Sequence, residues 1–154
     1  MDVTADELAG IVDLFDALTR EELAQALSEL AFKRREDVAA EAFDDDVEAA
    51  LSSYHLVAVP AAEEDFLVTG PSAFPSLPAD AEDLPHILDV PERRVDHDRL
   101  ARVVSERFEA DVSSALAEDD TDRIKTLLEV SYDLPVWADV DVEASRARLD
   151  DALA

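Results

Sequence analysis

Cysteine is absent from this chain of 154 residues, and glycine occurs only twice, at Gly10 and Gly70. Without cysteine the chain can form no disulfide, hold no zinc through thiolates and perform no thiol chemistry. Two isolated glycines exclude a glycine-rich phosphate loop and a dinucleotide-binding fingerprint, and no Gly-x-Ser-x-Gly motif is present. We therefore expect no cofactor, and the sequence favours a protein that is not an enzyme.

Lysine is almost as rare, with only Lys33 and Lys125 beside eleven arginines. Against these 13 cations stand 39 Asp and Glu, which gives a net charge of −26. The charge is spread along the chain, with −14 over residues 1–70 and −12 over residues 71–154, which argues against an acidic tail. At about 1 M salt the Debye length is roughly 3 Å, so that repulsion between surface carboxylates is largely screened. We interpret the composition as an adaptation to high salt.

No uninterrupted apolar run is long enough to span a bilayer, which takes about 18 residues or more. The N-terminal stretch MDVTADELAG is acidic, whereas a signal peptide begins with a basic segment. We therefore expect no membrane span, no contact with a membrane and a location in the cytoplasm.

Apolar residues recur at helical spacing, which predicts a mainly α protein with one small β-hairpin. Thr4 with Glu7, and Thr19 with Glu22, have the spacing of capping boxes at two helix starts. We expect the first unit to span residues 1–70, with helices at about 5–17, 20–33, 36–43 and 45–53 and strands at about 54–59 and 65–69.

Residues 71–91 are rich in proline, and we predict that they form an ordered connector that lies over the surface. Phe74 and Leu77 should anchor this connector in the main body. A helical unit, residues 92–154, should then pack against the first unit, with helices at about 96–117, 121–132 and 142–153. Trp137 falls in the segment YDLPVWADVD, which we predict to be a turn. It would either fill the interface between the two units or form an exposed contact.

Three helices followed by a hairpin is the element order of a winged helix, and Val47, Leu51 and Leu56-Val57 lie where its recognition helix runs into the first wing strand. Residues 20–70 therefore resemble that superfamily. The stretches LTREELAQALSELAFKRRED and GPSAFPSLP also resemble an uncharacterised conserved protein family of halophilic archaea. The second resemblance implies no known activity.

A winged helix that binds DNA needs cations, because contacts of Lys and Arg with phosphate supply most of the affinity. Residues 36–92 hold fifteen carboxylates and no lysine or arginine. The outward positions of the predicted recognition helix and hairpin tip are Asp45, Asp46, Glu48, Ala49, Ser52, Ser53, Glu63, Glu64 and Asp65. Nucleic acid is thus an unlikely partner, although Lys33, Arg34 and Arg35 could touch phosphate if the helix did bind DNA.

Other candidate sites are few. The three histidines, His55, His86 and His97, lack the i,i+4 spacing of a helical metal site, so we expect no bound metal. Arg102 and Arg107 within 96–117 have carboxylates four residues away, which predicts pairs on a solvated face. Arg93 and Arg94 precede this predicted helix and lack an obvious helical partner, and we predict that they contact another molecule, together with Phe74 and Trp137.

The sequence thus favours a non-catalytic protein-interaction or scaffold module that meets another protein or a second copy of itself. The long helix 96–117 and the region of Phe74 and Trp137 are the candidate surfaces. The alternative is a winged-helix transcriptional regulator that binds DNA through Lys33, Arg34 and Arg35 beside helix 45–53.

Overall fold

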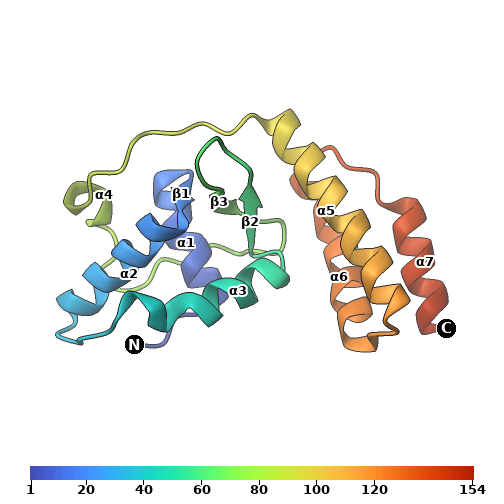
Figure 1. The fold of residues 1–154 in the computed structure, drawn as a ribbon, viewed down its shortest axis with the longest axis horizontal. Coiled ribbons are helices and arrows are strands. Elements are labelled where there is room, and N and C mark those ends of the chain that lie inside the picture. Colours follow the sequence, from blue (N-terminus) through green and yellow to red (C-terminus); the bar gives the residue numbers. More distant parts are fainter. The chain divides into compact units, whose positions relative to one another are not determined.

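The computed structural model describes residues 1–154, apart from the side chain of Ala40, as two compact units (Figure 1). The units are Met1–Arg94 and Val95–Ala154. Helices dominate both, and the small sheet lies in the first unit, which confirms the predicted fold class of a mainly α protein with a small β element.

The first unit has three helices of eight residues or more, three strands and two short helical segments. In chain order they are α1 (Ala5–Phe15), β1 (Leu18–Thr19), α2 (Arg20–Lys33), the 3-10 helix η1 (Ala40–Phe43), α3 (Asp44–Ser52), β2 (Leu56–Val59), β3 (Phe66–Thr69) and α4 (Leu84–Ile87). Both predicted capping boxes are present. Thr4 accepts the amide of Glu7, Thr19 accepts the amide of Glu22, and each glutamate accepts the threonine amide in return.

The predicted helix 36–43 is wrong in its first half, because only Ala40–Phe43 is helical. The cause is the way α2 ends. Arg35 has a φ of 59°, its amide donates to the Phe32 carbonyl, and the amide of Glu36 donates to the Ala31 carbonyl. This is the Schellman arrangement, which turns the chain sharply away from the helix axis. It is normally built on glycine, so the arginine gives no sequence signal for it.

The three strands form one antiparallel sheet in the order β1-β3-β2. Leu18 pairs with Leu67, and Val57 pairs with Val68. The predicted hairpin corresponds to β2 and β3, while β1 was not expected. This strand has only two residues, the second of which is the N-cap of α2, and two residues are too few to show the alternation of apolar and polar side chains by which strands are recognised.

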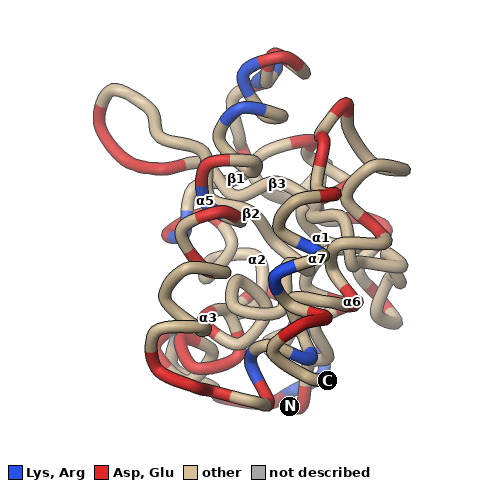
Figure 2. The backbone as a smooth tube through the Cα atoms, turned by 90° about the vertical axis from the view of Figure 1, so that its right-hand side faces the viewer, with Lys and Arg blue, Asp and Glu red and all other residues tan. Residues whose placement is uncertain are grey.

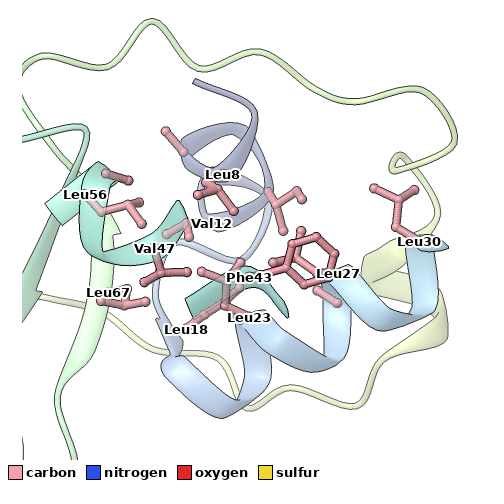
Figure 3. Packing of buried hydrophobic residues seen from close by; sticks show 14 of the residues in the cluster. Leu8, Val12, Leu18, Leu23, Leu27, Leu30, Phe43, Val47, Leu56 and Leu67 are labelled. Carbon is pink, nitrogen blue, oxygen red and sulfur yellow. The ribbon is translucent and has the colours of Figure 1, made fainter. Parts of the chain in front are cut away.

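One hydrophobic core holds the first unit together (Figure 3). Leu8 and Val12 of α1 point towards Leu23 and Leu27 of α2, and Val47 of α3 closes the cluster beside the sheet. Phe43, at the end of η1, is only 3% exposed, so that this short helix is fixed by its aromatic side chain. Because α3 packs Val47 into this core, the opposite face of the helix lies in solvent.

The second unit consists of α5 (His97–Ala117), α6 (Thr121–Trp137) and α7 (Glu143–Leu153), each of which contacts the other two. Phe108, Leu127, Leu134 and Leu149 are buried in its core. The predicted end of α6 at residue 132 and the predicted turn around Trp137 are wrong, because the helix continues through Pro135 to Trp137.

Candidate interaction surface

The outer face of α3 is acidic and exposed. Val47 and Ala50 point into the core, with 4% and 0% of their surface exposed. The exposed residues on the same helix include Asp45, Asp46 and Glu48, as the sequence predicts. An α-helix start favours such carboxylates through its macrodipole, but a DNA phosphate would meet them as like charges.

The loop between β2 and β3 extends this acidic character. Glu63, Glu64 and Asp65 are all exposed at its tip. Figure 2 shows how few basic positions, in blue, accompany the acidic ones in red. Any partner of α3 and this loop therefore faces carboxylates from both elements.

Most cations of the first unit are engaged within it. Arg20 donates to Glu48 at 2.7 Å, which neutralises one carboxylate of α3. Lys33 donates to the Asp80 carbonyl at 3.2 Å, and Arg34 donates to the Ala79 carbonyl at 2.8 Å. Of the predicted phosphate-binding group, two members thus hold the connector to the end of α2, and only Arg35 is exposed.

Arg93 is likewise a structural cation, and the prediction that it contacts a partner does not fit its position. Its two terminal nitrogens donate to the two carboxylate oxygens of Glu22, at 2.5 and 2.9 Å, and the guanidinium lies 4.6 Å from the centre of the Phe66 ring. Only 16% of the Arg93 side chain and 17% of the Glu22 side chain are exposed. The hydrogen bond from Arg93 lowers the pKa of Glu22, and the same contact raises the pKa of Arg93.

Arg94, by contrast, is exposed at the rim of a groove of about 420 Å³. The groove lies between the end of α1 and the connector, and Leu14, Phe15, Leu88 and Val90 provide its apolar wall. The prediction that Arg94 contacts a partner stays a prediction, and unlike Arg93 its side chain is exposed.

The two aromatic candidates lie in different surroundings. Phe74 is 81% exposed and Leu77 is 39% exposed, so neither anchors the connector to the body as predicted. Trp137 lies half-buried at the last position of α6. Phe32, at 76% exposure, and Tyr132, at 56%, are further exposed aromatics that the sequence pattern does not reveal.

Ser53, His55 and Asp6 form a cluster that the sequence does not indicate. The hydroxyl of Ser53 lies 2.6 Å from Nδ1 of His55, and Nε2 of His55 lies 3.6 Å from the Asp6 carboxylate. A serine, a histidine and an aspartate in line can activate the hydroxyl as a nucleophile. Here the second distance exceeds a hydrogen bond, and the same Asp6 oxygen accepts the amide of Phe74 at 3.0 Å. The cluster ties α1, the turn after α3 and the connector together.

In the second unit an open groove of about 830 Å³ runs between α5 and the start of α7. Asp96, Asp98, Asp139 and Asp141 line it, together with Arg102. Despite these carboxylates, no group of three or more acidic or histidine side chains among the described residues is placed to hold a metal ion.

The predicted pairing on α5 is present in part. Arg107 lies 3.5 Å from Asp111 one helical turn later, and Arg123 of α6 reaches the same carboxylate at 3.1 Å. The long helix thus carries ion pairs that join it to α6 as well as pairs along its own surface.

These features define a mainly helical protein with a small antiparallel sheet and an acidic surface. Within the described residues no helix is long and apolar enough to cross a membrane. The model of a family of unknown function, DUF7109, matches residues 6–154, and the chain belongs to that family. Comparison with curated proteins and with solved structures gave no match.

Proposed function

We propose that this chain is a non-catalytic protein-interaction module that works in the cytoplasm at high salt. The observation that carries the proposal is the charge of α3 and the β2–β3 loop. Their exposed charged side chains are all carboxylates, while Arg20, Lys33, Arg34 and Arg93 are held by other parts of the same unit. A surface of this kind suits a protein partner and repels a polyanion.

The order of elements supports a winged-helix-like scaffold for this role. A helix, a short strand, two further helices and a hairpin follow one another, and the first strand pairs with the last. In DNA-binding members of the helix-turn-helix class, the second helix of the motif enters the major groove. In this chain that helix is α3, whose exposed acidic residues would meet the phosphates.

The same order of elements favours the second candidate, a winged-helix DNA-binding regulator. Its cations would be Lys33, Arg34 and Arg35. Proteins that bind duplex DNA tightly typically neutralise about six to ten phosphates. Arg35 is exposed, whereas Lys33 and Arg34 would have to leave their carbonyl partners in the connector, so the first candidate is the better supported.

Two measurements on the full chain at high KCl test the proposal. The first is cross-linking with a dihydrazide, which joins activated carboxylates and therefore suits a protein with 39 Asp and Glu and two lysines. The second is light scattering, which gives the mass of the purified chain. We expect a cross-linked partner protein or a self-assembled species. Titration with duplex DNA should show no complex. A chain that is monomeric and uncross-linked in its native cells, or a DNA complex weakened by Arg35→Ala, would overturn the proposal.

A further inference from the structure

The exposed loop Phe74–Leu77 lies between two well-anchored ends. Ala73 packs against the core of the first unit, and on the other side Pro78 and Ala81 are buried. Phe74, Pro75, Ser76 and Leu77 are all exposed. An exposed phenylalanine gains none of the free energy that burial of an aromatic ring provides, so the position of Phe74 calls for an explanation.

The backbone of this loop is fixed by α1. The carboxylate of Asp6 accepts the amide of Phe74 at 3.0 Å, and the carbonyl of Asp6 accepts the amide of Ser76 at 3.0 Å. The segment just before the loop is fixed as well, because the amide of Ser72 donates to the Tyr54 carbonyl at 3.0 Å. The aromatic side chain is therefore presented from a backbone that is already ordered.

Both glycines of the chain serve this arrangement. A Cβ atom at Gly10 would lie 2.2 Å from the carbonyl oxygen of Ser76, and one at Gly70 would lie 2.2 Å from the carbonyl oxygen of Tyr54. Neither position could carry a side chain without moving backbone. The prolines at 71, 75 and 78 further restrict the segment.

From these contacts we infer that Phe74 is the anchor of a protein-docking loop, which inserts into an apolar pocket rimmed by Lys and Arg on a different protein. This inference rests on the proposed function and names the surface and the chemistry of its partner. An anchor on an ordered backbone loses little conformational entropy on binding, and buried aromatic anchors are typical hot spots.

The negative charge around the loop determines which kind of partner it favours. Asp6 lies directly beneath the loop, and the unit Met1–Arg94 holds 23 Asp and Glu against six Lys and Arg. In a two-fold contact between copies the same acidic surfaces would face one another. High salt screens exposed charges, but it screens less those that become partly buried at an interface, so a partner with a basic rim gains there from charges that a second copy would have to overcome.

The test uses the photo-reactive aromatic residue p-benzoylphenylalanine in the full chain, placed at position 74 and, as a control, at position 32. Phe32 is a matched control because its side chain is similarly exposed, at 76% against 81%, in the same unit. After illumination in the native cells, we expect position 74 to yield an adduct with another protein and position 32 to yield none. The adducted peptide of that protein should contain lysine or arginine.

The partner identified in this way is then purified and titrated with the full chain at high KCl. We expect Phe74→Ala to raise the Kd at least about tenfold, and Phe32→Ala to change it less than twofold. Thermal unfolding of both variants shows whether the fold is retained. We expect that it is, because both side chains are exposed.

Three results would overturn the inference: no adduct at position 74, an adduct with a second copy of the chain, or equal effects of Phe74→Ala and Phe32→Ala. If carboxylate cross-linking still joins the chain to a partner while position 74 fails, the proposed function stands and only the docking loop is wrong. If neither method finds a partner, both are wrong.

Discussion

The proline inside α6 leads to a quantitative prediction. Proline has no amide hydrogen, so Pro135 cannot donate to the carbonyl of Ser131 one turn earlier. Arg146 of α7 takes its place: Nη2 donates to that carbonyl at 2.5 Å, and Nε donates to the Ser131 hydroxyl at 3.1 Å. Its guanidinium also lies 4.2 Å from the centre of the Tyr132 ring. We predict that α6 tolerates its proline because of this arginine.

The magnitude follows from the groups that Arg146→Met would leave behind. Ser131 is fully buried, so its carbonyl would lose its charged donor without gaining water, at a cost of about 1 to 3 kcal/mol. Loss of the contact with Tyr132 adds about 0.5 to 1 kcal/mol. The Ser131 hydroxyl keeps its own acceptor, the Leu128 carbonyl. Methionine retains much of the apolar stem, so we expect a total loss of roughly 1.5 to 4 kcal/mol.

A double-mutant cycle with Pro135→Ala isolates the carbonyl. Alanine restores the amide hydrogen, which can then donate to Ser131 in the ordinary helical pattern. In that background Arg146→Met should cost about 1 to 2 kcal/mol less than in the native chain. Urea unfolding at high KCl, followed by the fluorescence of Trp137, measures this directly, because the only tryptophan lies in the second unit.

A matched control is Arg148→Met in the same helix, where the exposed side chain should change the free energy of unfolding by less than about 0.5 kcal/mol. If Arg146→Met costs the same in both backgrounds, within about 0.5 kcal/mol, the arginine does not compensate for the proline and the reasoning is refuted.

Two further predictions concern the first unit. Glu22→Gln should lower the free energy of unfolding near pH 7 by about 1 to 3 kcal/mol, because it breaks the charged hydrogen bonds with Arg93. Folding lowers the pKa of Glu22, so the stabilisation that its carboxylate provides is present above the ordinary value of 4.5 and is lost as the pH falls through the folded value. When chemical unfolding is measured from pH 6 downwards, the free energy of unfolding should therefore decline less in the variant than in the native chain. Parallel declines would contradict this. Arg35→Gly should raise the free energy of unfolding by up to about 1 kcal/mol, because glycine adopts a φ of 59° without strain, and a thermal midpoint below the native one would refute it.

The sequence predicts those parts of the fold that depend on neighbouring residues. The capping boxes at Thr4 and Thr19 are local devices, and both are present. The apolar stripe of α1 also identifies its buried face, including Leu8 and Val12. By contrast, the carbonyl of Ser131, which Pro135 leaves without an amide donor, is bound by Arg146, eleven residues after the proline in another helix, and no local pattern contains that information.

The candidate surface is harder to predict for the same reason. The acidic face of α3 follows from its helical spacing around Val47 and Ala50. The pairing of Arg93 with Glu22 joins positions 71 residues apart, so Arg93 looks free in the sequence although it is not. Phe74 looks like a core residue because its type is apolar, whereas the hydrogen bonds that the amides of Phe74 and Ser76 donate to Asp6, about 70 residues earlier, fix its backbone at the surface.

These long-range contacts give a structural reason why the chain uses arginine rather than lysine. Several arginines join segments that are distant in sequence, through paired carboxylate oxygens, carbonyls or an aromatic ring: Arg20, Arg34, Arg93, Arg123 and Arg146. A planar guanidinium can make two hydrogen bonds and stack at the same time, which an ammonium cannot. Partly buried pairs are also screened less by salt than exposed ones.

This use of arginine bears on the choice between the two candidate functions. A cation that cross-links the fold is not available to a phosphate, because binding DNA would first break an internal contact and leave its partner without a donor. For Arg93 that partner is a half-buried carboxylate, Glu22, which also caps α2. The contacts that stabilise the first unit therefore oppose DNA binding by α3 and the β2–β3 loop, and under the proposed function the acidic surface would meet a partner of opposite charge.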